Sequence, residues 1–298
     1  MNTQLISKVQ YKRSEKGEFH NVKSRNLEET LSLIESFSWA TERIGAPVEL
    51  TCPSITIEHP VGTYLKIGIY FSGKFSLYFL NAHGRLYFEV ADTLQQACLR
   101  ANEFFQMEDF KFGKHQFVFN PSAHFRTRSF EYMTNFKAAL QFFRFPLYLT
   151  PAILLFGWMK SSTFSTGLYW IAGPIAVLML YLLCSPLIYF YFNYQAFDRH
   201  KFLRLSTGHH SFMFGTTDKA RVFKKEDIAE IAAYGGRNSR SFWSFCEVFV
   251  ITFHNGEYIQ FTSLLISGGK LRKKFLNHSI AERWNYFPAI HTIDYPQV

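Results

Sequence analysis

The sequence predicts an α+β membrane protein: an N-terminal domain of helices and sheet, a two-helix transmembrane hairpin, and a C-terminal β domain with a terminal helix. Three observations carry this prediction. Of the 298 residues, 48% are hydrophobic and only 10 are Pro, which excludes a disordered chain. Residues 145–197 hold a single formal charge, that of Lys160. Short runs rich in β-branched and aromatic residues lie on both sides of this segment, as is typical of strands.

Residues 1–120 are expected to form an N-terminal cytoplasmic α+β domain. Asn26 followed by Glu29 is the pattern of a capping box at a helix start, and Gly45 and Pro47 stop the helical segment. Asp92 is expected to cap a second helix over 93–106. Strands are expected between the two helices at 54–58, 63–71, 74–80 and 85–90.

Residues 121–144 form a basic, Phe-rich bridge in which apolar residues recur at three- and four-residue steps. This pattern predicts a juxtamembrane helix. Two interpretations stay open. The helix could lie in the membrane interface with its basic residues towards anionic headgroups, or it could be a cytoplasmic extension of the first span packed on a domain.

Residues 145–197 are interpreted as two membrane spans, because a helix needs about 20 apolar residues to cross the hydrocarbon layer and a charge there is costly. The spans are placed at 142–159 and 168–192. Basic residues flank the hairpin on both sides, so the positive-inside rule predicts a two-span protein of the bacterial inner membrane with both termini in the cytoplasm. The alternative is a buried hairpin inside a large soluble core. Residues expected to anchor the hairpin at the membrane interface are Arg144, Trp158, Lys160, Trp170, Tyr194 and Arg199.

Residues 198–298 are expected to form the C-terminal cytoplasmic domain. Asn255 and Gly256 supply the turn of a long hairpin over 245–263. The run from Gly268 onwards is expected to be one terminal helix reaching past Trp284. Shorter strands are expected at 202–206, 211–214, 220–223 and 228–234.

One run in this domain supports a family resemblance. Residues 221–231 read RVFKKEDIAEI, a strand followed by Glu-Asp-Ile-x-x-Ile, and they precede the long hairpin. In this order the segment resembles the bacterial pleckstrin-homology-like (PH-like) domains that are appended to membrane anchors. The resemblance implies a two-sheet, partly open barrel capped by a helix, which usually acts as a binding or assembly module without catalysis.

Enzyme signatures are missing from the sequence: it has no Gly-rich phosphate loop with Lys and Ser/Thr, no nucleophile elbow and no His-Glu-x-x-His. The four Cys have no paired spacing. His209 and His210 are adjacent, and neighbouring residues of a strand point to opposite faces, so they are interpreted as a turn-exposed surface pair. A metal site could form through folding, but nothing local indicates one. No catalytic residue, cofactor or metal is therefore predicted.

Two basic clusters are candidate sites for a membrane surface or an anion. Each basic residue held near an anionic leaflet gains roughly 1 kcal/mol. The alternative is a solvated surface. The net charge of +9 is spread along the chain, so no nucleic-acid partner is expected. The clusters are Arg237 and Arg240 in a Gly-rich loop, and Lys270, Arg272, Lys273 and Lys274 at the start of the last helix.

The function expected from these patterns is a non-enzymatic integral membrane protein that presents two cytoplasmic domains for protein binding or assembly. A specific version is an immunity-type protein. The expected partners are the lipid bilayer, an unidentified protein, an anionic lipid and, through small residues such as Gly167 and Gly173, a second copy of the chain. The alternative is a lipid- or ligand-handling membrane enzyme or transporter component. Against it, residues 145–197 contain no Asp, Glu, Arg or His to serve as a relay.

Overall fold

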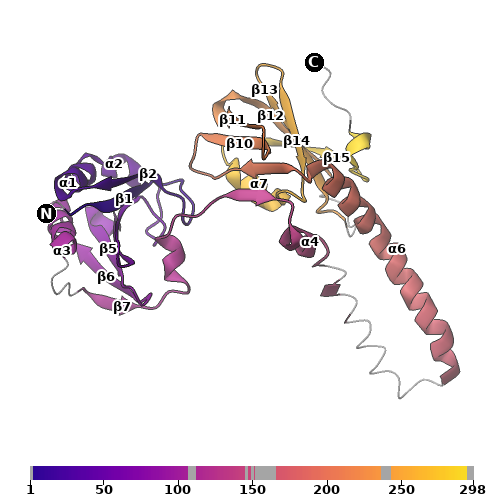
Figure 1. Cartoon of the computed structure of the whole chain (residues 1–298), viewed down its shortest axis with the longest axis horizontal. Helices are drawn as coiled ribbons and strands as arrows, with labels where there is room; N and C mark the ends of the chain where they lie inside the picture. The colour runs from indigo at the N-terminus through magenta and orange to yellow at the C-terminus, as the bar shows by residue number, and fades with distance from the viewer. Residues whose placement is uncertain are drawn as a thin grey trace. The chain divides into compact units, whose positions relative to one another are not determined.

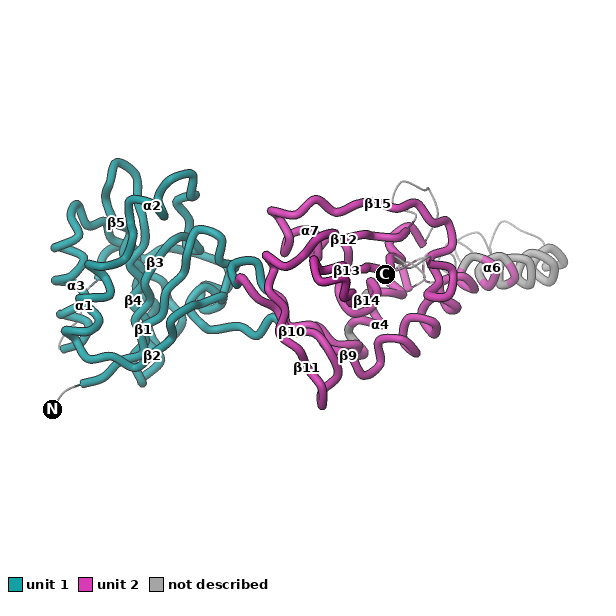
Figure 2. The backbone as a smooth tube through the Cα atoms, turned by 90° about the horizontal axis from the view of Figure 1, so that it is seen from above, with its two compact units in different colours: residues 1–130, 206–209 teal, residues 131–205, 210–298 magenta. Residues whose placement is uncertain are grey.

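The chain divides into two compact units in the computed structural model, which describes residues 3–106, 112–144, 147–148, 151, 166–235 and 243–293. Unit 1 comprises Met1–Phe130 and Ser206–His209, and unit 2 comprises Glu131–Leu205 and His210–Val298 (Figures 1 and 2). The boundary at residue 130 lies ten residues beyond the expected one. The described residues are mostly β-sheet with few helices.

Unit 1 is built on one antiparallel sheet with the strand order β2-β1-β3-β4-β5-β6-β7. Its strands are β1 (Leu5–Gln10), β2 (His20–Arg25), β3 (Ser54–His59), β4 (Thr63–Ile69), β5 (Phe75–Leu80), β6 (Leu86–Ala91) and β7 (Lys114–Gln116). Its helices are α1 (Leu27–Ser36), α2 (Trp39–Arg43) and α3 (Leu94–Gln106), with short 3₁₀ turns η1 (Phe71–Gly73) and η2 (Pro121–His124). The four strands expected between the helices are confirmed as β3 to β6, whereas the β1–β2 hairpin was not predicted.

The capping box at the start of α1 is confirmed. The side-chain oxygen of Asn26 accepts a hydrogen bond of 2.8 Å from the backbone N–H of Glu29, and the Glu29 carboxylate accepts one of 3.0 Å from the N–H of Asn26. The start of α3 differs in detail. Thr93 caps it by accepting from the N–H of Gln96, and the side chain of Asp92 pairs with Lys74 instead.

Both faces of the unit 1 sheet are covered. One face packs an apolar core, including Ile57 and Leu77, against the helices. The other face carries Lys66, which is buried, next to a smaller apolar cluster around Tyr64 and Phe125. Every residue of the central strand β4 is therefore buried.

Unit 2 contains two four-stranded sheets, in the orders β11-β10-β9-β8 and β14-β13-β12-β15. All pairs are antiparallel except β12 with β15. Their strands are β8 (Glu131–Met133), β9 (Lys201–Arg204), β10 (Ser211–Thr216), β11 (Ala220–Lys224), β12 (Ile228–Gly235), β13 (Glu247–Phe253), β14 (Tyr258–Thr262) and β15 (Ile280–Trp284). The helices are α4 (Phe136–Phe142), α6 (Thr166–Asp198) and α7 (Gly268–Lys274), with 3₁₀ turns η3 (Lys225–Asp227) and η4 (Ile290–Thr292).

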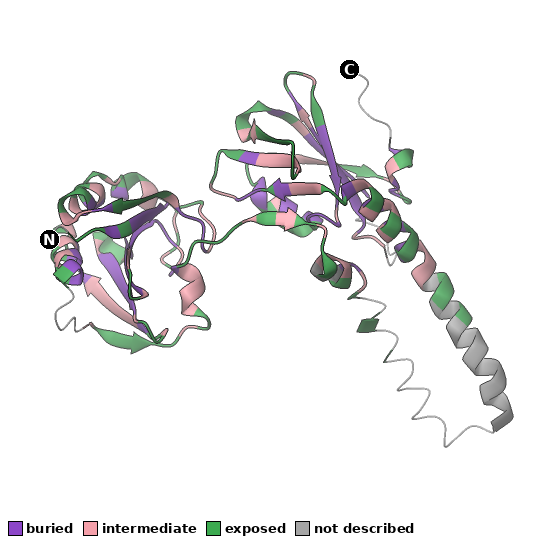
Figure 3. Ribbon diagram, in the orientation of Figure 1, coloured by how far each residue is buried: buried purple, intermediate pink, exposed green. Residues whose placement is uncertain are grey.

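Residues from both sheets of unit 2 share one core. Phe212 of the first sheet and Phe249 and Phe261 of the second belong to the same buried cluster, and Leu271 of α7 and Phe275 directly after it complete the cluster. Figure 3 shows buried segments on strands of unit 2. Two sheets closed by a helix are what the resemblance to PH-like domains implied for this part of the chain.

A second apolar cluster of unit 2 holds the end of α6. Leu187, Phe190 and Tyr194 have no exposed surface, and they pack with residues of β12 and β13 such as Val248. The Tyr194 hydroxyl donates a hydrogen bond of 2.7 Å to the carbonyl oxygen of Pro288. The aromatic end of the uncharged segment therefore belongs to the core of unit 2.

The predicted two-span membrane anchor is contradicted. Among the described residues, which leave out 152–165 and with them most of the first expected span, no helix combines the length and apolar character needed to cross a membrane. The burial of Leu187, Phe190 and Tyr194 supplies a physical reason, because part of the apolar run serves a protein core. Three predictions are therefore wrong: the α+β membrane fold class, the integral-membrane function, and the two-span localisation with its inferred orientation.

The terminal helix is also shorter than expected. Only α7 is helical, and the following residues form β15, which pairs in parallel with β12 from Ile231 opposite Ile280 to Gly235 opposite Trp284. Ile280 and Trp284 are four residues apart, which suits one face of a helix as well as one face of a strand. The free edge of β12 decides in favour of the strand.

Candidate functional site

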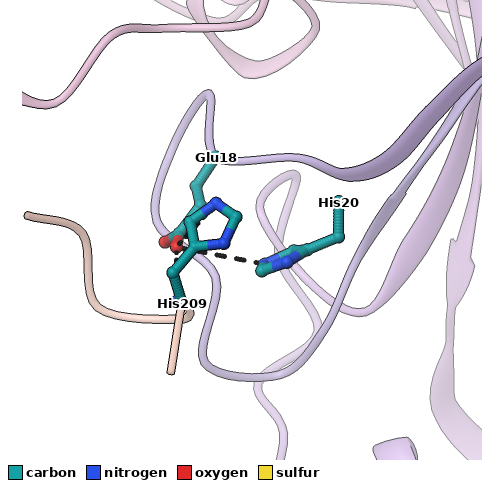
Figure 4. Close-up of side chains that lie close together, drawn as sticks. All are labelled: Glu18, His20 and His209. Carbon is teal, nitrogen blue, oxygen red and sulfur yellow. Dashed lines mark hydrogen bonds and ion pairs between the residues drawn. The ribbon is translucent and has the colours of Figure 1, made fainter. Parts of the chain in front are cut away.

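Three side chains of metal-ligand type lie together in unit 1: Glu18, His20 and His209, here called the histidine–carboxylate cluster. One ligand atom from each lies within 4.8 Å of the others. The Glu18 Oε1 atom is 3.9 Å from Nε2 of each histidine, and the two imidazole centroids are 4.2 Å apart. Figure 4 shows both rings directed at the carboxylate.

The β1–β2 connection positions the first two members of the cluster. Gly17 has a φ of +80°, a conformation open to glycine, and it turns the chain into Glu18. The buried side chain of Gln10, at the end of β1, holds the turn. Its Nε2 donates to the carbonyl oxygens of Glu15 (3.1 Å) and Glu18 (3.0 Å), and its Oε1 accepts 2.7 Å from Nζ of Lys66.

Lys66 supports this connection from the sheet. Its ammonium group has no exposed surface and donates to the Leu50 and His124 carbonyl oxygens in addition to Gln10. Burial lowers the pKa of Lys66 to about 7. Hydrogen bonds to these three oxygens compensate part of the cost of burying the ammonium group. Lys66 therefore has a structural role: it holds Gln10, which in turn holds the β1–β2 connection.

The loop between β9 and β10 brings the third member. Glu15 Oε1 accepts from the backbone N–H of Thr207 at 2.8 Å, and Glu18 Oε1 accepts from the N–H of Gly208 at 2.9 Å and of His209 at 3.0 Å. A Cβ atom at Gly208 would lie 3.0 Å from Glu18 Oε1 and 3.2 Å from His20 Nε2. A side chain at this position would make tight contacts with both groups, which glycine avoids.

Burial differs among the three members. The Glu18 side chain is fully buried, that of His20 is 16% exposed and that of His209 is 47% exposed. In addition to its contact with His209, the His20 ring packs edge-on against the ring of Tyr11, with 5.1 Å between the two centroids. The cluster thus has a buried anionic side and a solvent-accessible imidazole side. Such an arrangement can bind a cation.

Unit 2 exposes a group of aromatic side chains, here called the aromatic surface and defined by Tyr189, Trp243, Trp284, Tyr286 and Phe287. Trp284 is 71% exposed, Tyr286 51% and Tyr189 42%. Trp243 packs edge-on against Tyr286 at 5.5 Å and donates from Nε1 to the Tyr286 carbonyl oxygen at 2.9 Å. Tyr189 of α6 contacts Phe287 at 5.3 Å. These contacts hold the rings in place while leaving their outer faces accessible.

The comparison with protein families matches the two-sheet unit. A family model described as a PH domain covers residues 131–274, from β8 to the end of α7. Residues 131–274 form a PH-like domain. No curated protein and no solved structure matches the chain. The membrane anchor that the resemblance implied has no support.

The PH-like domain begins earlier than the sequence suggested. Its first strand, β8, pairs with β9 through Tyr132 opposite Leu203, and Arg204 forms a salt bridge with Glu131. The helices α4 and α6 lie between these two strands in the chain. The sequence placed the domain start near 198, after the helical segment.

The four basic residues predicted around α7 have different environments. Arg272 forms salt bridges with Glu247 at 2.6 Å and Glu282 at 2.7 Å, and Lys274 is 5% exposed. Lys270 and Lys273 are exposed. Two of the four side chains could therefore reach an anionic ligand, which remains a prediction. The second predicted pair, Arg237 and Arg240, lies outside the described residues.

The residues expected at a membrane interface are also dispersed. Arg144 and Arg199 are exposed, whereas Tyr194 is buried in the PH-like domain. The Trp170 side chain, like Trp158 and Lys160 as a whole, lies outside the described part of the structure.

The sequence interpretation missed His20 and the meeting of His20 with His209. No local spacing could reveal it, since 189 positions separate the two histidines. The one available signal was Gly208 before His209, which fits a close backbone approach.

Proposed function

We propose that this chain is a non-catalytic binding protein that binds a protein partner through the aromatic surface of unit 2, the unit that contains the PH-like domain. One observation carries the proposal: three aromatic residues at and just after the end of β15 are exposed together, with Trp284 at 71%. Exposed Trp and Tyr are the residue types that contribute most binding energy in protein interfaces.

The position of the aromatic surface supports the same proposal. β15 is an edge strand of its sheet within the described residues, with β12 as its neighbour. An extended partner segment can add to such an edge through backbone hydrogen bonds, while pockets between side chains supply specificity. The aromatic rings next to this edge would contact the apolar side chains of that segment.

A cross-linking experiment tests the proposal. A photo-reactive phenylalanine analogue replaces Trp284 in the full chain, and the same analogue at Leu276 is the matched control. Leu276 is 72% exposed and also lies in unit 2, outside the aromatic surface. We expect a defined protein to cross-link from position 284 and not from 276.

The affinity of that protein is then measured with purified components. Trp284→Ser should weaken binding at least about tenfold, as loss of a central interface aromatic does. Leu276→Ser should leave it unchanged. Equal cross-linking from both positions, or equal affinity of both variants, would refute the proposal.

A further inference from the structure

We propose that Glu18, His20 and His209 form a binding site for one divalent transition-metal cation, with Zn²⁺ as the best fit. The proposal goes beyond protein binding and concerns a different unit. It rests on the convergence of two imidazoles and a buried carboxylate from segments far apart in the sequence. Each of these groups is a common zinc ligand.

The distances are close to those of a tetrahedral site. Ligand bonds of about 2.1 Å place neighbouring donor atoms about 3.4 Å apart. Nε2 of His20 and Nε2 of His209 each lie 3.9 Å from Glu18 Oε1. All three donor atoms lie within 4.8 Å of one another, so side-chain rotations that bring them closer by at most about 1.4 Å would complete the coordination.

The Glu18 carboxylate has a place left for the ion. A carboxylate has about four acceptor positions. Oε1 accepts from the N–H groups of Gly208 and His209, and Oε2 accepts 2.8 Å from the N–H of Glu15. One acceptor position remains on Oε2, so the ion would bind the carboxylate through Oε2, the oxygen next to the one from which the histidine distances are measured. The three backbone donors fix the carboxylate in the way that outer hydrogen bonds orient a metal ligand.

The backbone is also arranged in advance of any ion. Gly208 lets the loop approach closely enough for His209 to meet His20, whereas a Cβ atom there would crowd Glu18 and His20. In the segment that carries His20, the next residue, Asn21, has a φ of +51°. The side-chain oxygen of Asn21 accepts a hydrogen bond of 2.7 Å from the guanidinium of Arg25, which holds this backbone conformation. Little conformational entropy remains to be lost when the ligands bind an ion.

The ligand set selects the class of cation. Two imidazole nitrogens and one carboxylate suit Zn²⁺ and its neighbours Co²⁺, Ni²⁺ and Cu²⁺, whereas Mg²⁺ and Ca²⁺ prefer oxygen ligands. Three protein ligands leave one tetrahedral position, and the 47% exposure of His209 lets water reach it. The site would hold an ion with an exchangeable fourth ligand.

Metal content and affinity of the full chain test the proposal. The chain is prepared without a histidine tag, stripped with a chelator and dialysed against Zn²⁺, and bound zinc is measured by mass spectrometry. We expect one equivalent. Co²⁺ in place of Zn²⁺ should give the intense visible absorption of tetrahedral coordination.

Single-residue variants assign the binding to the cluster. His209→Ala and His20→Ala should each lower zinc affinity at least about tenfold. His210→Ala is the matched control, because this neighbouring histidine is exposed and outside the cluster, and it should bind as the unchanged chain does.

A second readout separates lost ligands from lost folding. Zn²⁺ should raise the thermal midpoint of the unchanged chain and of His210→Ala, because a ligand of the native state stabilises it, and should not raise that of His209→Ala. His209 is half exposed, so its removal should leave the circular dichroism spectrum unchanged. Substoichiometric zinc, or the same affinity loss in His210→Ala as in His209→Ala, would overturn the proposal.

Discussion

Asp198, the last residue of α6, should make the stability of unit 2 fall as the pH rises through the range near 5. Its side chain has no exposed surface. Burial raises the pKa of Asp198 from 3.8 to about 6, although Thr262 opposes the shift by donating 2.6 Å from its hydroxyl and 3.0 Å from its N–H to Oδ2. Folding therefore favours the protonated form of this carboxyl.

The sign and the size follow from proton linkage. Between the two pKa values the folded chain binds more protons than the unfolded chain, so the free energy of unfolding decreases as the pH rises. The stabilising contribution is fully present below pH 3.8 and is lost as the pH rises towards and past 6. One pKa unit corresponds to about 1.4 kcal/mol, so the loss between pH 4.5 and 7 is about 2 kcal/mol.

Asp198→Asn removes the titration and keeps an oxygen that can accept the two bonds from Thr262. Hydrogen exchange of peptides from β13 and β14, corrected for intrinsic rates, reports the opening free energy of unit 2 alone. We expect the pH slope of the unchanged chain to exceed that of the variant by about 2 kcal/mol over this range. The two chains are compared by their pH slopes and not by their absolute stabilities, because Asp198→Asn also removes the ion pair between Asp198 and Lys201.

Asp218→Asn is the matched control, since Asp218 is exposed between β10 and β11. It should keep the pH slope of the unchanged chain. Equal slopes in the unchanged chain and Asp198→Asn would refute the reasoning, because the buried carboxyl would then not be the group that titrates.

Two further variants test other parts of unit 2. Tyr194→Phe removes the hydroxyl that donates to the carbonyl of Pro288 and leaves a buried acceptor unsatisfied, so unit 2 should lose about 1–3 kcal/mol in the same exchange measurement. No loss would contradict the role of this bond. Replacing Lys270 and Lys273 together with Gln should weaken binding of the full chain to phosphatidylserine vesicles by about 1 kcal/mol per residue, while Lys219→Gln, at another exposed lysine, should not. Unchanged binding of the double variant would remove α7 as the anion site.

Local signals in the sequence predicted what local physics determines. The capping box of Asn26 and Glu29 satisfies backbone donors within one turn, and it forms as expected. The turn around Asn255 and Gly256 connects β13 and β14 as expected, because the φ of +82° at Gly256 suits glycine. Neither feature depends on a distant part of the chain.

Features set by distant partners could not be predicted in the same way. β8 has only three residues and no apolar alternation, and it forms a strand because it pairs with β9. β15 has helical spacing and becomes a strand through β12. The histidine–carboxylate cluster needs Gly208 to bring His209 against His20, a contact that only the folded chain creates.

The uncharged segment, residues 145–197, shows both a signal in the local sequence and the effect of distant partners. Its missing charges were interpreted as a bilayer signal, yet Leu187, Phe190 and Tyr194 at its end are buried beside β12 and β13. The segment lies in the chain between β8 and β9, two neighbouring strands of one sheet. Because β8 and β9 pair with each other, the two ends of the insertion between them must lie side by side at this sheet. Contacts at the end of α6 fix its position: the Tyr194 hydroxyl donates a hydrogen bond to the carbonyl oxygen of Pro288, and the Asp198 carboxyl accepts one from the Thr262 hydroxyl. The PH-like domain is therefore complete only when both ends of the helical insertion are counted as part of it.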